Sequence, residues 1–309
     1  MTDQQPPTPR QSGPSRGPER IGLGIGAALC AVFLFAVTDA VVKDLSERYS
    51  AFQIVFFRYL FGLIPVTAVV WYAGGLKALR TRRLRFHMVR ACLLFVALTS
   101  FFAALKELPL AEAIATAFTA PLFVAALSGP VLGEKVGPRR WGAVAAGFVG
   151  AIIIIRPGTE AFQPATLLVL LSAFSFALMV LTTRLLTRTE SNAALLTYAT
   201  LGAGMASLPF QAFVWQAPVA GDFPFFLFIG LVGGSAALLI IIAYRNAPAA
   251  VVAPFEYTGL LWGSLIGWIV WREEPDPAVW VGAGIIALAG VYITHRETRK
   301  SPSEVHPKP

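Results

Sequence analysis

Four charged side chains stand inside long apolar stretches of this sequence, where an ion has little access to water. They are Asp39, Arg58, Glu112 and Glu256. An unpaired charge in hydrocarbon costs between about 2.5 and more than 10 kcal/mol, so such residues pair with each other, bind a ligand or carry protons. The pattern is typical of membrane proteins that handle polar or charged solutes within the bilayer.

Arg58 keeps its charge in any environment that a protein offers, and its planar guanidinium binds a carboxylate at two points. Asp39, on the preceding apolar stretch, falls at a similar predicted depth and is the expected partner. Two interpretations remain open. The pair is structural or reaches towards the membrane surface, or Arg58 binds the carboxylate of a substrate.

Glu112, Thr116, Thr119 and Phe123 recur at the spacing of one helical face, polar at one end and aromatic at the other. We expect this face to line a cavity, with Glu112 as a substrate or proton ligand. The alternative for Glu112 is a place in the first turn of a helix, where a carboxylate suits the helix dipole.

Glu256 stands deeper in its apolar stretch and shares a face with Gly259 and Gly263, which admit a close neighbour or a ligand. We expect Glu256 to bind a coupling proton or the cationic end of a substrate. Aromatic residues close by predict a box around a ring-bearing substrate, with lipid-facing or core packing as the alternative; they are Phe118, Phe255, Tyr257 and Trp262.

The elements that would hold these residues are membrane-spanning helices. Apolar residues make up 56% of the 309 residues and charged residues 14%, a balance that soluble domains do not show. Several stretches without charge reach the roughly 20 residues that span about 30 Å of hydrocarbon, and they lack the alternation of barrel strands. Ten spans are predicted: 22–42, 53–72, 87–105, 110–131, 140–156, 164–184, 192–214, 223–244, 249–271 and 277–294.

The chain contains an internal repeat. Landmarks of its first half return 139 positions later in its second half. Because each copy holds five spans, the two copies enter the membrane from opposite sides, and inverted repeats of this kind are typical of alternating-access transporters. The landmarks are Pro109, Thr119, Glu134, Pro138 and Trp141, followed by Pro248, Thr258, Glu273, Pro277 and Trp280.

The basic residues predict an orientation. With both termini in the cytoplasm, all but six of the 25 Lys and Arg residues lie on the cytoplasmic side, as the positive-inside rule favours. The exceptions are Lys43, Arg48, Lys106, Arg156 and Arg272 outside, and Arg58 in the membrane. The net charge of +8 is spread over short loops, which argues against a nucleic-acid partner.

With the repeat laid out, the chain resembles the drug/metabolite transporter superfamily, specifically its EamA-type members with ten helices. The resemblance implies an all-α integral membrane protein, two inverted five-helix repeats at 22–156 and 164–294, a central substrate cavity and no nucleotide hydrolysis. Independently of the resemblance, composition predicts a disordered cytoplasmic tail at 1–20 and a cytoplasmic tail at 295–309, of which 301–309 has the same disordered character. The resemblance rests on Phe57-Arg58, Pro109, Thr119-Ala120-Pro121, Gly133-Glu134 before Trp141-Gly142, Pro248 and Glu273.

Other features narrow the function. Cys30 and Cys92 lie in apolar spans without metal-ligand spacing, and His87 and His295 are isolated at predicted membrane edges, so no enzyme, metal site or cofactor is expected. We expect an inner-membrane transporter that exports small metabolites, with amino acids or related zwitterions as the leading class. The alternatives are uptake of a nucleoside-like or vitamin metabolite and, in a different class, a channel or membrane-bound enzyme. A homodimer is a further expectation.

Overall fold

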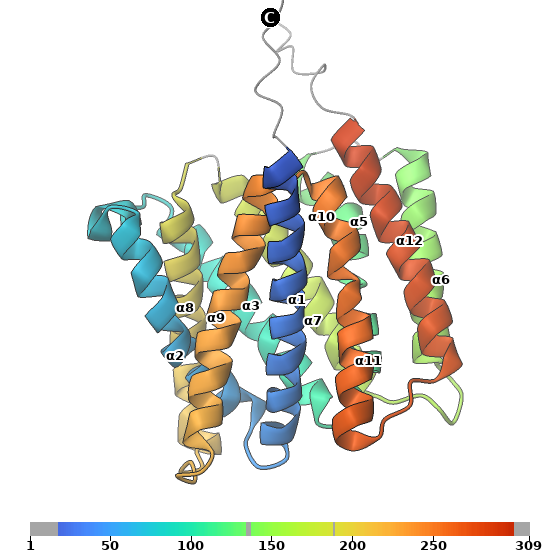
Figure 1. Cartoon of the computed structure of the whole chain (residues 1–309), viewed down its shortest axis with the longest axis horizontal. Helices are drawn as coiled ribbons and strands as arrows, with labels where there is room; N and C mark the ends of the chain where they lie inside the picture. The colour runs from blue at the N-terminus through green and yellow to red at the C-terminus, as the bar shows by residue number, and fades with distance from the viewer. Residues whose placement is uncertain (1–17, 134–136, 188, 300–309) are drawn as a thin grey trace, which may run out of the picture.

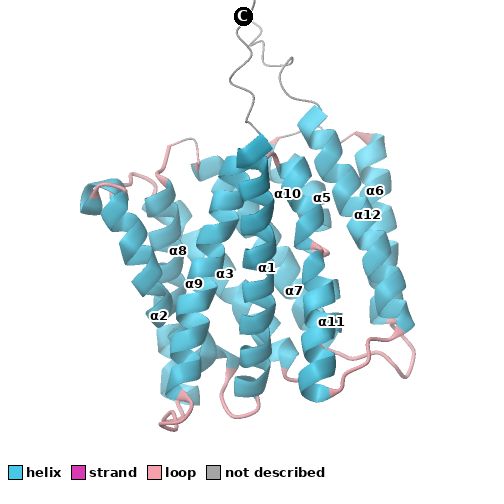
Figure 2. Ribbon diagram, viewed as in Figure 1, coloured by secondary structure: helices cyan, strands magenta, loops and turns pink. Residues whose placement is uncertain are grey.

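The computed structural model describes residues 18–133, 137–187 and 189–299, and these residues form helices joined by short loops (Figures 1 and 2). The bounds are α1 Pro18–Ser46, α2 Ala51–Tyr72, the 3₁₀ segment η1 Gly75–Leu79, α3 Leu84–Leu105, α4 Leu110–Ala117, α5 Ala120–Leu132, α6 Pro138–Ile155, α7 Ala165–Leu186, α8 Asn192–Val214, α9 Phe223–Asn246, α10 Ala249–Glu256, α11 Thr258–Trp271 and α12 Pro277–Arg299.

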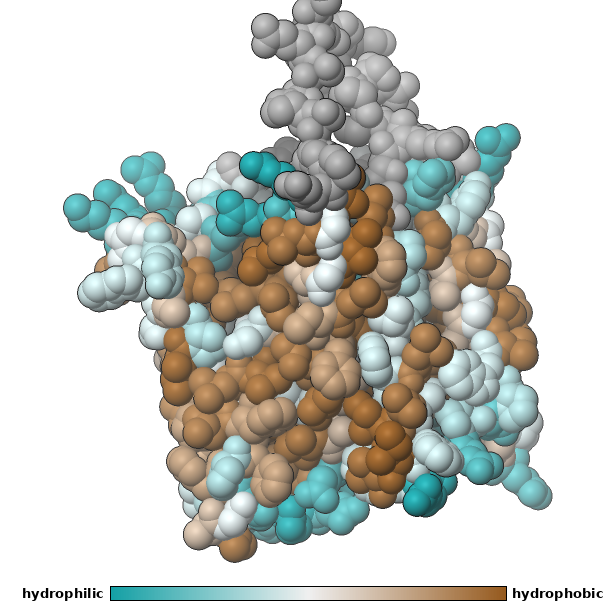
Figure 3. Space-filling view, viewed as in Figure 1, coloured by the Kyte–Doolittle hydropathy of each residue, from teal (hydrophilic) through white to brown (hydrophobic). Residues whose placement is uncertain are grey.

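Ten spans cross the bundle, as the sequence predicts. Nine of them are long and apolar enough to cross a membrane in the described part of the chain, and Leu110–Leu132, drawn as α4 and α5, is one of these. The tenth consists of α10 and α11 together, each of which is too short to qualify alone. On the face shown in Figure 3, apolar side chains cover most of the middle and hydrophilic residues gather towards the two ends, which is the surface that a bilayer requires.

Helix α1 begins and helix α12 ends at the same end of the bundle, shown at the top of Figure 1. We call this end the terminal side and the opposite end the far side. Helix α4 begins at the far side, whereas its counterpart α10 begins at the terminal side, so the two repeats are inverted. The residues predicted as tails lie mostly outside the described part, although α1 already begins at Pro18 and α12 continues to Arg299.

Most of the packing joins one repeat to the other. Helix α1 packs on α9, α2 on α8 and α9, α3 on α7 and α8, and α6 on α12. Small residues permit the closest approaches, as expected for helices in lipid: Gly230 faces Phe61, and Gly234 faces Pro65. Near the start of α1, Gly24 contacts Ala247, whereas Gly22 and Gly26 have no neighbour within 4 Å of an added Cβ.

The fourth and ninth spans are broken, whereas the sequence predicts one continuous helix for each. Helix α4 ends at Ala117, with Phe118 as its C-cap, and α10 ends at Glu256, with Tyr257 as its C-cap. The two breaks lie at equivalent positions of the repeats, 139 residues apart. Discontinuous helices at matching places in two inverted repeats are the usual sign of a transport site.

Equivalent threonines of the two repeats stabilise the two breaks. The Thr119 hydroxyl donates to the carbonyl of Thr116 at 2.8 Å, and the Thr258 hydroxyl donates to the carbonyl of Phe255 at 2.6 Å. A carbonyl that leaves the helical ladder inside a membrane must find another donor, and the hydroxyl supplies it. Pro121 adds to the first break because it has no N–H for the preceding turn. The repeated threonines of the sequence therefore mark the repeated breaks.

Candidate transport site

The two broken spans meet at their breaks. The rings of Phe118 and Tyr257 lie 4.8 Å apart between centroids, tilted by 60°. These two residues are each other's counterparts in the repeats, separated by 139 positions. When equivalent residues of two copies contact each other, the contact lies on the two-fold axis that relates the copies. The Phe118–Tyr257 contact therefore marks the internal axis, at the middle of both spans.

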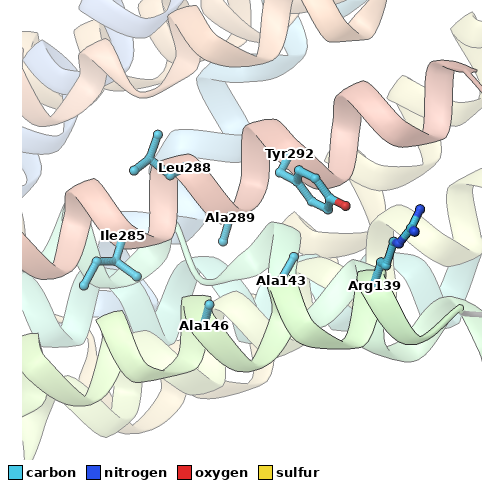
Figure 4. A pocket seen from close by; sticks show the side chains of 7 residues that line it. All are labelled: Arg139, Ala143, Ala146, Ile285, Leu288, Ala289 and Tyr292. Carbon is cyan, nitrogen blue, oxygen red and sulfur yellow. The ribbon is translucent and has the colours of Figure 1, made fainter.

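A second contact between repeats shows where that symmetry fails. On the far side, α6 and α12 touch through their backbones at Gly150 and Gly282, where added side chains would meet main-chain oxygens. The counterparts, Ala289 and Ala143, instead line a groove of about 440 Å³ towards the terminal side (Figure 4). Arg139 and Tyr292 lie at one end of the groove. The two helices are tight on the far side and open on the terminal side.

The broken spans show the same asymmetry. On the far side α4 packs against α11, and the Ile114 side chain fills the space over Gly259 and Gly263. The symmetric counterparts, α5 and α10, make no extensive contact among the described residues. The contact between the broken spans is thus closed on the far side, between α4 and α11, and has no equivalent on the terminal side among the described residues.

An ionic latch fastens the far side. The Lys43 ammonium lies 2.5 Å from Glu273 Oε1 and donates to the Leu108 carbonyl at 2.6 Å. The other Glu273 oxygen accepts the backbone N–H of Leu110, in the first turn of α4, at 2.9 Å. Lys43 also lies over the Trp271 ring. Glu273 therefore caps the first turn of α4 and pairs with a basic residue; its counterpart Glu134 lies outside the described residues.

Asp39 lies one turn inside this latch, on α1, and Arg58 reaches the same region from α2. The Arg58 guanidinium packs against Gly233 of α9 and lies 5.5 Å from the centre of the Phe102 ring of α3. Asp39 and Arg58 interact electrostatically, yet they form no direct ion pair in the described structure, and Nη1 of Arg58 is buried without a hydrogen-bond partner. Both residues are half-buried. Asp39 and Arg58 are therefore close to each other, as expected, but they make no direct contact.

Glu112 lies elsewhere. It is buried in α4, and the charges that act on it are Arg156 and Asp276, at the far-side ends of α6 and α12. Arg156 and Asp276 form an ion pair at 2.8 Å. A hydrogen bond from the Ala278 N–H, together with Arg156, lowers the pKa of Asp276. Glu112 thus does not share a site with Asp39 and Arg58.

The residues predicted to share a helical face with Glu112 do not form one continuous surface either, because the break lies between Thr116 and Phe123. The Thr116 hydroxyl is buried without a partner, Thr119 is used at the break, and Phe123 packs on Phe148 and Phe174. Constant helical spacing does not predict a common face where a helix is interrupted.

Glu256 is the last residue of α10, directly before Tyr257, and belongs to the terminal-side half. Its Oε1 accepts the Tyr244 hydroxyl of α9 at 2.7 Å. Asp39 and Arg58 lie in the far-side half. The sequence-predicted ionisable residues are therefore distributed along the bundle on both sides of the Phe118–Tyr257 contact, and do not form one cluster.

The predicted aromatic box is wrong in part. Only Phe118 and Tyr257 contact each other. Trp262 packs edge-on against Phe33 of α1, at 5.0 Å, and its ring nitrogen is buried without a partner. Phe255 packs against the small cluster between α1 and α9. Helical spacing groups residues by face, but Phe255 belongs to α10 and Trp262 to α11, and the two have different neighbours.

Other ionisable groups proved to be structural. Arg90 is buried in α3 and donates to Thr183 at 2.6 Å and to the Leu195 carbonyl at 2.5 Å. His87 is not isolated, since it lies 3.5 Å from Glu190. These contacts join α3 to α7 and α8 near the terminal side. Sequence reasoning also missed Tyr244 as the partner of Glu256, and no spacing signal points to it.

Comparison with known proteins agrees with this architecture. The model of the EamA-like transporter family matches residues 22–156 and 163–295. A solved crystal structure, 18% identical, superimposes with a TM-score of 0.60 over 92% of this chain and 99% of its own, which shows a shared fold. The chain belongs to the EamA-like transporter family of the drug/metabolite transporter superfamily. It is a multi-pass membrane transporter of small molecules and not an enzyme.

Individual relatives cover nearly the whole chain. The S-adenosylmethionine uptake transporter of Rickettsia prowazekii is 30% identical over 92% of this chain and 96% of its own. The riboflavin transporter of Vibrio cholerae is 31% identical over 89% and 94%. The pseudopaline exporter of Pseudomonas aeruginosa is 26% identical over 88% and 95%.

Proposed function

We propose that this transporter imports a metabolite that joins a heteroaromatic ring to a charged or polar tail, with S-adenosylmethionine as the leading compound and riboflavin as the second. Two of the relatives above are named for these compounds and match over almost their full length. Both compounds fall within the nucleoside-like and vitamin alternative that the sequence analysis left open.

The observation that carries the proposal is the Asp39–Arg58 arrangement. Two opposite charges face the interior without touching, and one guanidinium nitrogen has no hydrogen-bond partner. An amino-acid group presents the complementary charges, a carboxylate for Arg58 and an ammonium for Asp39. Binding such a group supplies the missing hydrogen bond and neutralises both charges, which offsets the cost of burying them.

Transport then follows from the inverted repeats. The structure is closed at the far side by the latch and by α4 on α11. The opposite state exchanges the conformations of the two repeats, so that α5 packs on α10 and the far side opens. In the proposed orientation, both termini lie in the cytoplasm, so the closed far side of the described state faces away from the cytoplasm.

Export of amino acids or other zwitterions is the second candidate. It is favoured by the relative named as a pseudopaline exporter and uses the same Asp39–Arg58 charges. The two candidates differ in direction and in the need for a ring.

A transport assay separates them. The purified protein is reconstituted in liposomes, and entry of labelled S-adenosylmethionine, riboflavin and methionine is measured beside protein-free liposomes. We expect saturable entry of S-adenosylmethionine or riboflavin and counterflow when the liposomes are preloaded with the same unlabelled compound. Entry of methionine with neither ring compound carried would replace the proposal by the amino-acid candidate.

A further inference from the structure

We propose that Phe118 and Tyr257 determine specificity by binding the heteroaromatic ring of the substrate on the internal two-fold axis. The inference rests on the proposed function and adds the residues that recognise the ring. Aromatic side chains bind the flat faces of nucleobases by stacking, independently of charge.

The first argument is position. Because the two rings are counterparts in the repeats and contact each other, they lie on the axis that relates the two halves. An exchange of conformations between the repeats moves their surroundings but leaves an axial contact in place. A ring bound there can face the terminal side in one state and the far side in the other, without leaving its aromatic partners.

The second argument is exposure. The residues around the first break are buried, including Ala115, Thr116 and Thr119, whereas Phe118 and Tyr257 are both half-buried. A half-buried aromatic ring in the middle of a bundle is not fully covered by its neighbours, so part of its surface is available to a ligand. Helices α5 and α10, which adjoin Phe118 and Tyr257 in the chain, are not among the helix pairs with extensive contact in the described part of the molecule.

The third argument is that glycines fix both rings. The Tyr257 hydroxyl lies directly against Gly290 of α12, where any added Cβ would overlap it. The Phe118 ring lies over Gly259, whose added Cβ would be 3.5 Å from the ring carbon Cζ. A preorganised aromatic contact binds a flat ligand with less loss of entropy than a mobile one.

The fourth argument is the distance to the charged pair. Val32 of α1 contacts Gly259, beside the rings, and Asp39 lies seven residues further along the same helix. Seven residues correspond to about 10 Å of helix. The site therefore offers a ring contact at one end and two opposite charges at the other, at a separation suited to an extended molecule with a base at one end and an amino-acid group at the other.

The test uses fragments of the leading substrate as competitors. Adenosine carries the ring without the amino-acid group, and methionine carries the amino-acid group without the adenine ring. Inhibition of labelled S-adenosylmethionine entry by each fragment is measured for the parent, Phe118→Leu, Tyr257→Leu and Tyr257→Phe. Phe33→Leu, which alters the separate ring pair with Trp262, is the matched control. Size-exclusion profiles of all variants establish that they fold.

We expect both leucine variants to raise the half-inhibitory concentration of adenosine by about tenfold, while that of methionine stays within about twofold. Tyr257→Phe and Phe33→Leu should behave like the parent. Unchanged adenosine inhibition in folded leucine variants would overturn the inference, and so would an equal loss for both fragments, which indicates a packing role.

The outcome also distinguishes this inference from the proposed function. If the parent carries riboflavin, the same comparison is made with lumichrome as the ring fragment and ribitol as the tail. If the parent carries neither ring compound, the proposed function is wrong and the ring contact is wrong with it. If the parent carries one of them and the leucine variants still recognise the ring, only the inference is wrong.

Discussion

The charged residues within the apolar helices of this protein have different roles, and the surrounding sequence does not distinguish these roles. Arg90 and Asp39 both stand in apolar stretches, yet Arg90 is fully engaged by Thr183 and Leu195, whereas Asp39 has a charge partner but no direct contact with it. A satisfied ion is part of the fold, and an incompletely satisfied ion is available to a ligand. The second kind marks the candidate transport site.

Arg58→Lys tests whether the guanidinium binds a carboxylate. Lysine keeps the charge but loses the planar fork, so we expect normal expression and thermal stability with at least a tenfold loss of transport. Inhibition by methionine should weaken more than inhibition by adenosine. A variant that transports S-adenosylmethionine at the parental rate would exclude a two-point clamp at Arg58. Arg48→Lys, at the exposed far-side surface, serves as the control.

Glu256→Gln tests proton coupling. Glutamine retains an oxygen that can accept the Tyr244 hydroxyl but cannot titrate. We therefore expect a folded variant whose transport no longer responds to external pH or to an imposed proton gradient, while Glu112→Gln has a smaller effect. The measurement is initial rate against pH in liposomes with and without a gradient. A parental pH profile in Glu256→Gln would leave the residue with a packing role only.

At the scale of the helices, the packing of the broken spans distinguishes the two sides of the molecule. On the far side Ile114 packs on Gly263, and the repeat offset relates this pair to an equivalent pair, Ala253 and Val124. Both members of the equivalent pair are half-buried in this structure. A large residue meets a small one in each pair, on opposite helices, so the same fit can form on either side.

Cysteine pairs at these positions should trap opposite states. In a background without Cys30 and Cys92, Ile114→Cys with Gly263→Cys should cross-link on oxidation in the state described here. Val124→Cys with Ala253→Cys should cross-link slowly, and faster during transport. Each cross-link should stop transport, and reduction should restore it. Immediate cross-linking of the second pair without substrate would contradict the asymmetry between α4–α11 and α5–α10.

The far-side loop before α12 predicts a dependence of stability on pH. Hydrogen bonding by the Ala278 N–H and pairing with Arg156 lower the pKa of Asp276 in the folded protein. A lowered carboxyl pKa stabilises the fold above the unfolded-state pKa, and this stabilisation is lost as the pH falls through the folded-state value. Thermal unfolding in detergent should therefore fall less steeply between pH 6 and about pH 3 for Asp276→Asn than for the parent. Parallel curves would show that the contact does not contribute.

At the scale of the whole molecule, orientation decides which solution each state faces. Tags on both termini should be cytoplasmic. A cysteine introduced in the exposed far-side loop at 157–160 should react with an impermeant reagent in intact cells, while one at Arg82, on the terminal side, should stay protected until the cells are opened. The basic residues around Arg82 should hold that side in the cytoplasm. Opposite labelling would reverse the proposed orientation.

The sequence by itself determined that the helices lie in a membrane, how many spans there are, that the chain contains a repeat, and to which family it belongs. These properties depend on composition and on the spacing of residues along the chain. The sequence also marked Thr119 and Thr258 as equivalent. It did not show that each threonine closes a helix break, since Pro121 is present in only one copy and the geometry of the second break is not encoded in a local motif.

Only the tertiary structure decided which residues share a site. Glu112 and Arg58 are both charged residues within apolar stretches of the sequence. In the fold, however, α4 places Glu112 near Arg156 and Asp276, whereas α2 places Arg58 near Asp39. The far-side closure is also tertiary, because Lys43 and Glu273 are 230 residues apart. Two repeats that share landmarks at a constant offset pack differently here, and a difference between two packings of similar energy cannot be read from local patterns.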